Sequence, residues 1–288
     1  MKKFWIIVLI IISGSFLFFR DDILNFYYSF SLNLPEIGKG IENVTQEIEK
    51  QISTPPPLRA VREDPQSFLT KAGVIQWTNT QREKYGLPPL KESLELDASA
   101  EIKAQDMFLN QYFAHNSPSG EGVGNLAGEV GYEFIAIGEN LAMGNFKDDE
   151  TLVQSWMDSP GHRANILNEK YTEIGVAVMK DEYEGRITWI AVQHFGFPLS
   201  ACSKPDEALK SEIDKNQSQI YELEVVLGNL KNEIQVIRPR QRTIYSQKID
   251  QYNNLVSQYN SLVVETETLI NKYNIQVKVF NECAGGGK

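Results

Sequence analysis

The sequence predicts an α+β domain in the middle of the chain, followed by an antiparallel hairpin of two long helices. Three observations support this prediction. Helix-like and strand-like periodicities alternate between residues 68 and 197. Beyond them, apolar residues keep a heptad-type spacing through two runs that a proline separates. An uncharged apolar run, residues 4–19, precedes everything else and indicates a segment related to a membrane.

The apolar run at residues 4–19 follows Lys2 and Lys3, a pattern typical of an export signal or a membrane anchor. As a helix it would be about 24 Å long, slightly short of a ~30 Å hydrocarbon core. The absence of a small-residue cleavage site after it favours an uncleaved transmembrane anchor, and a cleaved signal peptide is the alternative. Because the lysines precede the run and Asp21 and Asp22 follow it, we expect the body of the protein outside the cytoplasm, anchored or secreted.

Residues 20–65 are expected to form a linker, because three consecutive prolines, Pro55–Pro57, stiffen and extend the chain as a spacer would. The folded domain is then expected to span residues 66–198. Its first helix covers Thr70–Tyr85 and ends at a glycine. A second amphipathic helix, with apolar residues from Leu96 to Phe108, is expected to end near His115.

The second half of this domain is expected to hold two more helices and two strands. A helix begins near Asp148 or Asp149, and Ser159 has the position of an N-cap, with Pro160 first in a short helix. Residues 174–179 and 187–195 have the character of strands joined by a turn that contains glycine. Helices packed on an antiparallel sheet give a layered α+β fold.

Charge excludes one class of partner. The formal net charge is −10, and the sequence has no concentrated basic patch and no glycine loop for phosphates. Since binding of a phosphate backbone requires clustered positive charge, we do not expect a nucleic-acid partner.

His115, Glu139 and His162 are the candidate site residues, and each lies in a short motif flanked by turn-forming residues. Two imidazoles and a carboxylate could hold Zn²⁺ or another divalent cation and leave one position open for water. A bound cation of this kind lowers the pKa of its water to about 7. Without a metal, Glu139 or His162 is the candidate general base, although no catalytic residue can be assigned firmly. His194, in the middle of a strand, is expected to be structural.

Five sequence segments carry a family resemblance, and they occur in this order: WTNTQREKYGLPPL (Trp77–Leu90), YFAHNSPSG (Tyr112–Gly120), GENLA (Gly138–Ala142), SWMDSPGHRANIL (Ser155–Leu167) and WIAVQHFG (Trp189–Gly196).

Together these segments resemble the CAP superfamily of SCP-like extracellular domains, in its bacterial branch. The resemblance implies an α-β-α sandwich and a pocket of two histidines and two glutamates, which binds divalent metal in some members. His115, Glu139 and His162 match three of these positions. The second glutamate is replaced by Ser159, with Asp158 just before it, so Asp158 is included in the expected ligand pocket as a substitute.

Residues 203–283 are expected to form the antiparallel coiled-coil hairpin. Arg238-Pro239-Arg240 separates its two runs, and proline cannot continue a helix. A long helix that dimerises in parallel between chains is the alternative. The apolar 4-3 spacing involves Leu209, Ile213, Asn216, Ile220, Leu223, Leu227, Leu230, Ile234 and Ile237 in the first run, and Tyr245, Ile249, Tyr252, Val256, Tyr259, Val263, Thr266, Ile270, Tyr273, Val277 and Phe280 in the second.

The two cysteines, Cys202 and Cys283, lie at nearly equal distances from the expected turn, so folding of the hairpin would bring them together at its base. A disulfide is expected in an exported protein, where the environment is oxidising. Free or intermolecular thiols are the alternative.

These features favour an exported cell-surface protein whose CAP-like domain is a binding or interaction module with a His/Glu pocket able to hold a divalent cation. A metal-assisted hydrolase of peptides or envelope polymers is the second hypothesis, and a mainly structural assembly protein is the third. Expected partners are the membrane, through the N-terminal helix, and a small-molecule, lipid, peptide or surface-polymer ligand. Self-association through the coiled coil is a further possibility.

Overall fold

The computed structural model describes residues 37–38, 40–44, 50–237 and 241–285. The apolar run at residues 4–19 and the turn at residues 238–240 lie outside this part of the chain. None of the described helices has the length and apolar character needed to span a membrane. The chain divides into two compact units. We call the unit of Val44–Ser203 and the residues from Val279 the sheet unit, and the unit that contains Lys204–Lys278 the hairpin unit.

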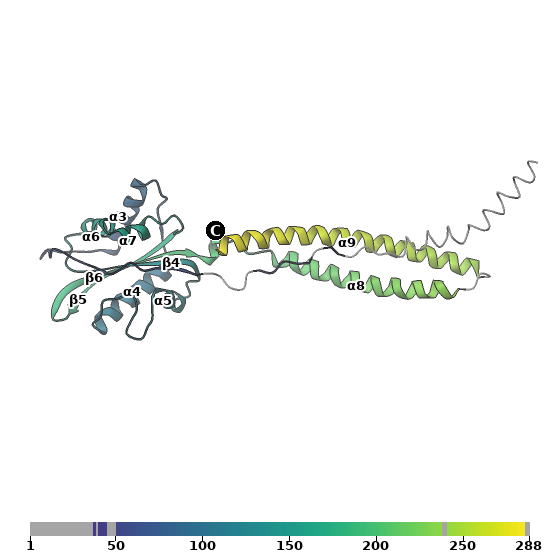
Figure 1. Cartoon of the computed structure of the whole chain (residues 1–288), viewed down its shortest axis with the longest axis horizontal. Coiled ribbons are helices and arrows are strands. Elements are labelled where there is room, and N and C mark those ends of the chain that lie inside the picture. The colour runs from purple at the N-terminus through teal and green to yellow at the C-terminus, as the bar shows by residue number, and fades with distance from the viewer. Residues whose placement is uncertain (1–36, 39, 45–49, 238–240, 286–288) are drawn as a thin grey trace, which may run out of the picture. The chain divides into compact units, whose positions relative to one another are not determined.

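The sheet unit is built on one mixed sheet (Figure 1). Its three long strands are antiparallel neighbours, with β6 between β4 and β5. The short strands extend the edges in parallel: β1 and β2 pair with β4, and β3 pairs with β5. The strands are β1 (Gln51–Ser53), β2 (Leu58–Arg59), β3 (Lys91–Glu92), β4 (Phe134–Met143), β5 (Glu173–Tyr183) and β6 (Arg186–Pro198).

Helices cover both faces of the sheet, as the α-β-α arrangement requires (Figure 1). One face is covered by α4 (Leu94–Leu109) and α5 (Val123–Glu129), and the other by α3 (Lys71–Lys84), α6 (Asp149–Asp158) and α7 (Pro160–Ile166).

The apolar core divides between these two faces because successive residues of a strand point to opposite sides. On β6, Trp189, Ala191 and Phe195 pack in the cluster on the α3, α6 and α7 side. Ile190 and Val192 pack in the cluster that includes α4 residues.

Several elements differ from the sequence-based expectation. The second helix, α4, ends at Leu109 rather than near His115, because Asn110 and Gln111 leave the helical conformation and Gln111 has a φ of 50°. Strand β4 was not expected, since its run FIAIGENLAM does not alternate polar and apolar residues. All ten of its residues are buried, which is the pattern of a central strand covered on both faces.

The expected linker also contains folded residues. Gln51–Ser53 and Leu58–Arg59 are the strands β1 and β2, so the sheet begins within the segment expected to be a spacer. The three prolines lie between these strands, where no backbone pairing is recorded. Proline has no N–H to donate to a ladder, so the composition that indicated a spacer also fits a gap between two short edge strands.

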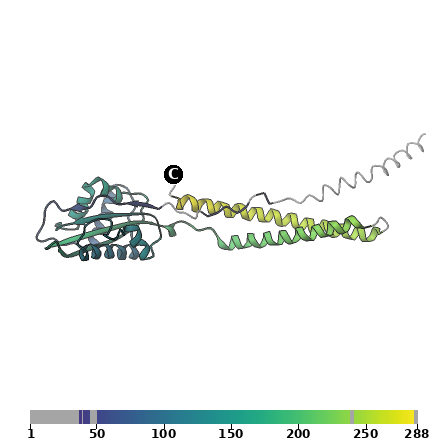
Figure 2. The ribbon, with the colours of Figure 1, turned by 60° about the horizontal axis from the view of Figure 1, so that its bottom comes forward.

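The hairpin unit contains α8 (Glu207–Val236) and most of α9 (Arg242–Ala284), which lie side by side in both views (Figures 1 and 2). The Tyr259 hydroxyl donates to Glu224 at 2.8 Å, and the Asp206 amide donates to Gln276 at 2.8 Å. Residues late in α8 thus meet residues early in α9, so the two helices run antiparallel. The expected 4-3 positions face inward, since the buried residues are Leu209, Ile213, Asn216, Ile220, Leu227 and Leu230 of α8, with Tyr252, Tyr259, Val263, Thr266, Ile270, Tyr273 and Val277 of α9.

Cys202 and Cys283 form the expected intramolecular disulfide, with their Cα atoms 5.7 Å apart. Both belong to the sheet unit, because the last turn of α9 is part of it. Phe280 and Ala284 of that turn pack with Ile135 and Cys202 in a small apolar cluster. The C-terminal end of α9 therefore contributes core residues to the sheet unit.

Candidate functional site

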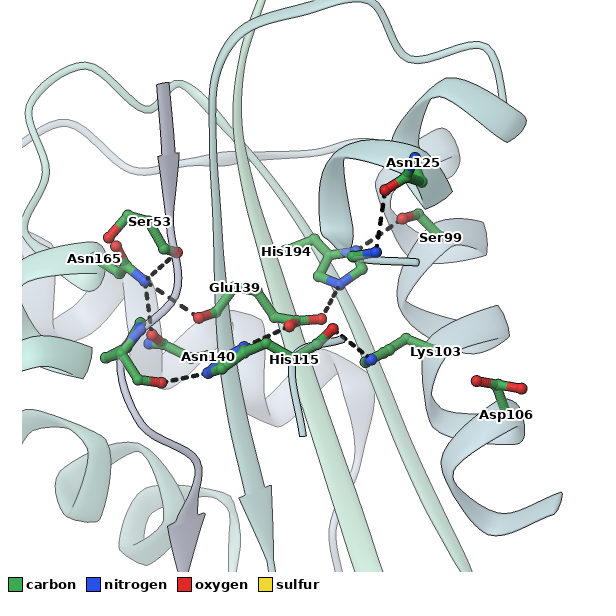
Figure 3. Close-up of polar contacts among 12 residues, drawn as sticks. Ser53, Ser99, Lys103, Asp106, His115, Asn125, Glu139, Asn140, Asn165 and His194 are labelled. Carbon is green, nitrogen blue, oxygen red and sulfur yellow. Dashed lines mark hydrogen bonds and ion pairs between the residues drawn. The ribbon is translucent and has the colours of Figure 1, made fainter. Parts of the chain in front are cut away.

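The centre of the candidate site is the carboxylate of Glu139, which is fully buried on β4. Glu139 lies directly opposite His194 of β6 in the antiparallel register. His194 Nε2 donates to Glu139 Oε2 at 2.9 Å (Figure 3). With Nε2 protonated, a neutral His194 ring accepts at Nδ1 from the Ser99 hydroxyl of α4, at 2.9 Å. The strand pairing and α4 together therefore fix this side of the carboxylate.

The second oxygen of Glu139 is held by His115, from the loop after α4. His115 Nδ1 donates to Glu139 Oε1 at 2.6 Å, and Nε2 donates to the carbonyl oxygen of Pro55 (Figure 3). Both ring nitrogens of His115 thus lie next to oxygen atoms that can accept a hydrogen bond. The His115 side chain is 14% exposed while Glu139 and His194 are 0% exposed, so His115 is the member of this group nearest solvent.

Lys103 of α4 positions the loop that carries His115. Its ammonium donates to the His115 carbonyl at 2.6 Å and to the Tyr112 hydroxyl at 3.2 Å. Burial lowers the pKa of Lys103, although the negative charges of Glu139 and Asp106 act in the opposite direction. Burial also raises the pKa of Tyr112, and its hydrogen bond to Asp106 adds to this effect.

Glu139 remains ionised despite its burial. Burial alone would raise its pKa, but hydrogen bonds from His115 and His194 outweigh burial and lower the pKa to about 2. A buried carboxylate with two imidazole donors and a nearby ammonium is a satisfied structural anion. Both of its oxygens are already used, which limits its capacity to take a proton from a substrate.

The next pair along the two strands points to the opposite face. Asn140 Nδ2 donates to Gln193 Oε1 at 3.3 Å and to the carbonyl of His162 at 3.2 Å. Asn165 Nδ2 lies within 3.0 Å of Asn140 Oδ1 and 3.3 Å of the carbonyls of Glu139 and Ser53 (Figure 3). These amides join α7, β4 and β1.

His162 lies on α7, on the face of the sheet away from the Glu139 side chain. Its Nδ1 is 2.8 Å from the Ser159 hydroxyl, and its buried Nε2 has no hydrogen-bond partner among the described residues. Burial, with a smaller contribution from the charge of His115, lowers the pKa of His162 to about 4. The two rings thus interact electrostatically, but the structure gives no direct bond between His162 and Glu139.

Ser159 is the N-cap residue of α7 and Pro160 follows it, as expected. An N-cap hydroxyl usually accepts a hydrogen bond from a backbone amide two or three residues later, which here would be Gly161 or His162. The Ser159 hydroxyl makes no capping bond and instead meets the imidazole of His162.

Asp158 does not join the buried group. It lies exposed at the end of α6, and its carboxylate accepts from Gln154 at 2.8 Å. One helical turn separates the two residues, so the side chain points along α6 rather than toward β4. The structure thus places this member of the expected pocket at the surface.

The expected metal ligands were His115, Glu139 and His162. Within the described part of the chain, no group of three or more His, Cys, Asp or Glu residues is arranged to hold a metal ion. The reason is visible in the contacts, since each oxygen of Glu139 and the outer nitrogen of His115 already has a partner. A cation could join these residues only if Glu139 or His115 gave up one of these partners.

A groove of about 670 Å³ lies beside β2 and α6, and its lining includes Leu58, Arg59, Asp158 and Ser159 but neither His115 nor Glu139. Residues 51–59, which we call the strap, lie along the edge of β4 and meet the outer nitrogen of His115 through the Pro55 carbonyl. The position of the strap was not foreseen, and neither was the pairing of His194 with Glu139, although His194 was expected to be structural. The signal for His194 was its rarity, because it is one of only three histidines in the chain.

Comparison with known proteins identifies similar domains. The sequence profile of the CAP cysteine-rich secretory protein family matches residues 75–195. The uncharacterized protein YkwD of Bacillus subtilis is 41% identical over 107 residues, which are 37% of this chain and 41% of YkwD. The uncharacterized membrane protein YlbC of the same organism is 34% identical over 110 residues, 38% of this chain and 32% of YlbC.

The chain therefore covers less than half the length of each of these relatives. Among solved structures, an extracellular protein from Bacillus anthracis that contains an SCP domain is 30% identical, with a TM-score of 0.39. The similarity covers 44% of this chain and 39% of that protein.

Proposed function

Because residues 75–195 form a domain of the CAP superfamily, we propose that this chain is an extracytoplasmic binding module whose recognition group is the imidazole of His115. Glu139 and His194 fix the orientation of His115 from behind. The outer nitrogen of His115 then points at an oxygen acceptor, a position now taken by the Pro55 carbonyl. The ligand class that fits this donor carries a carbonyl or carboxylate oxygen.

The observation that carries this proposal is the saturation of Glu139. A general base needs a free lone pair within reach of the substrate proton. Both oxygens of Glu139 accept from imidazoles, and its pKa is held at about 2, so its basicity at neutral pH is low. The same bonds make His115 a well-oriented donor, which favours recognition over proton abstraction.

Three observations support a location outside the cytoplasm. The Cys202–Cys283 disulfide is typical of an oxidising compartment. The apolar run after Lys2 and Lys3 has the composition of an anchor or signal, and the relative YlbC is described as a membrane protein. Protease treatment of intact cells should degrade the protein, and cell fractionation should recover it with the membrane if the anchor is retained.

The test of the binding role is retention on isolated cell-envelope material. The full chain in detergent should be retained on envelope fractions, and His115→Leu, which keeps bulk but has no donor, should lower retention at least tenfold. His115→Asn, which keeps a donor, should restore part of it. Equal retention of the wild type and His115→Leu would contradict the proposal.

A divalent-cation site with hydrolase activity is the second candidate, and one observation favours it. His162 Nε2 is a buried imidazole nitrogen with a lowered ring pKa and no partner among the described residues, the state in which imidazole binds metals. For Glu139 to bind the same cation as His162, one of its hydrogen bonds to an imidazole would have to break and be replaced by a bond to the ion. Titration calorimetry with ZnCl₂ should then give one equivalent bound in the wild type and none in His162→Leu. Absence of heat in both proteins would remove this candidate.

A further inference from the structure

The strap follows the edge of β4 but does not pair with it continuously. β1 pairs with Ala136–Gly138 and β2 pairs with Ala142 and Met143. Between them the strap residues are a threonine and three prolines, and proline cannot donate a ladder hydrogen bond. Side chains serve the β4 carbonyls in this gap, since Asn165 donates to Glu139 O at 3.3 Å and Trp156 donates to Leu141 O at 3.4 Å.

In this gap the strap is held by its main-chain carbonyls and one proline ring. His115 donates to the Pro55 carbonyl, and Asn165 donates to the Ser53 carbonyl at 3.3 Å. Pro55 is buried, whereas its neighbour Pro56 is exposed. The Pro55 ring rests on Gly161 of α7, where an added Cβ would lie only 2.6 Å from Pro55 Cβ. Gly161 therefore provides a seat for a proline ring.

These contacts could be made by a class of peptides rather than by a single peptide sequence. Carbonyl oxygens two residues apart occur in every peptide, and the seat requires a proline at the second of these positions. Proline preorganises an extended conformation, which lowers the entropy cost of binding. Addition of an extended peptide to an exposed strand edge is an established mode of recognition.

We infer that the β4 edge, with His115, Asn165 and Gly161, is a binding site for extended proline-containing peptides, and that the strap is the chain's own exchangeable occupant. This inference rests on the proposed binding function and names its ligand class. A partner peptide that places a proline on Gly161 replaces the strap and takes over the hydrogen bonds from His115 and Asn165.

Exchange is feasible because the strap is attached by little structure. Its strands have three and two residues, and Ile52 remains 58% exposed. Exchange must also release Leu58 from the core and Arg59 from the face of the Phe113 ring. Short edge pairings still open at a lower free-energy cost than a long central ladder such as β4–β6. The site is thus covered by the strap at rest and accessible to a competitor.

The test uses a fluorescein-labelled peptide with the sequence of Lys50–Ala60 and the full chain, with binding followed by fluorescence anisotropy. Pro55→Gly in the protein loosens the strap without altering its seat, so the peptide should bind this variant at least tenfold more tightly than it binds the wild type. Pro56→Gly is the matched control, because Pro56 is exposed, and its affinity should equal that of the wild type. A labelled peptide in which glycine replaces the buried proline should bind none of the three proteins detectably.

A second pair of variants tests the seat. Gly161→Ala in the Pro55→Gly background should weaken peptide binding at least tenfold. Gly128→Ala, at a glycine with no atom within 4 Å of an added Cβ, should leave it unchanged. Thermal melting followed by tryptophan fluorescence checks that each variant is folded. In the unsubstituted chain, excess peptide should speed hydrogen exchange of the Gln51–Ser53 amides and leave β6 unaffected, which tests displacement without any mutation.

Equal affinities for the Pro55→Gly and Pro56→Gly proteins, or no change in exchange with peptide, would overturn the inference. If envelope retention still depends on His115 in that case, the peptide site is wrong and the binding module stands. If retention is also independent of His115, both proposals are wrong.

Discussion

The interior of the sheet unit holds buried charged groups that are bonded to distant residues, whereas the buried polar side chains described in the seam of the hairpin are the uncharged Asn216 and Thr266. In the sheet unit, Arg82 is 0% exposed, and its guanidinium donates to four carbonyls, including those of Pro88, Ile166 and Asn168. In the hairpin seam, Thr266 bonds only the carbonyl of Leu262 one turn back, and the buried Nδ2 of Asn216 has no partner among the described residues.

The difference shows which interactions specify each unit. Many partners of the buried charged and amide groups in the sheet unit come from distant parts of the chain, so its fold depends on long-range pairs. The hairpin depends on a local apolar spacing that tolerates an unpaired amide. Removal of a polar group should therefore destabilise the first unit and stabilise the second.

The largest effect is expected from the disulfide, which ties the last turn of α9 into the sheet unit. Its loop of about 80 residues predicts a loss of roughly 4 kcal/mol in Cys202→Ala/Cys283→Ala by the chain-entropy model. Every tryptophan of the described residues lies in the sheet unit, so denaturation followed by tryptophan fluorescence measures this loss. A change below 1 kcal/mol would mean that the C-terminal turn stays docked without the covalent link.

Glu139→Gln should destabilise the sheet unit by about 3 kcal/mol at pH 7. The folded pKa of about 2 lies below the ordinary value of 4.5, so ionisation stabilises the fold above pH 4.5, and this contribution is lost as the pH falls toward 2. Less than half of it should remain at pH 3. Urea titrations at pH 7, 5, 4 and 3 should therefore show the two proteins converging in acid. A constant difference across this range would contradict ionisation as the source.

Ser159→Ala should lower the free energy of unfolding by about 1–2 kcal/mol, because within the described residues the Ser159 hydroxyl is the only side-chain hydrogen-bond partner of the buried His162 ring. The cause is the imidazole and not the helix cap, so in the His162→Leu background the same substitution should have little effect. A double-mutant cycle by urea denaturation measures this coupling. Additive costs would indicate that Ser159 stabilises α7 independently of His162.

The smallest expected effect has the opposite sign. Asn216→Leu should stabilise the hairpin by about 1 kcal/mol, because an apolar side chain replaces an amide whose buried Nδ2 has no partner among the described residues. Thermal unfolding followed by circular dichroism at 222 nm reports the helices, and Asn232→Leu at an exposed position of α8 is the control. Destabilisation by Asn216→Leu would show that the asparagine has a partner or sets the register.

The buried residues of the hairpin could be predicted almost one by one, because they follow from the spacing of apolar residues along each helix. Residues such as Ile220 and Tyr259 are buried where a 4-3 spacing places them. The disulfide followed from the near-equal arm lengths. The antiparallel pair β5 and β6 was also visible as two strands around a glycine turn, in which Glu184 and Gly185 have φ values of 47° and 79°.

The site was only partly predictable, because its contacts cross layers. His115 and Glu139 were identified as candidates, but the pairing of Glu139 with His194 depends on the register of β4 and β6, which no local pattern contains. Successive side chains of β4 point to opposite faces of the sheet, so the Glu139 side chain lies on one face and the Asn140 side chain on the other. The order of the motifs along the sequence therefore did not predict which histidines contact Glu139. Pro55 was assigned to a spacer because the proline content of a segment does not show whether one of its prolines packs against the folded domain.

The contribution of α9 to the sheet unit also sets an order of events during synthesis. A chain leaves the ribosome N-terminus first, so residues 50–203 are complete while the partners of Ile135 in the last turn of α9 are still about 80 residues away. At 5–20 residues per second, this delay is on the order of 5–15 s. During that interval the Cys202 thiol is unpaired and the apolar surface around it is exposed to solvent. The hairpin is the segment of chain synthesised between the two cysteines. A stop codon placed between the two cysteines would therefore leave the sheet unit with an open edge of its core and an unpaired thiol.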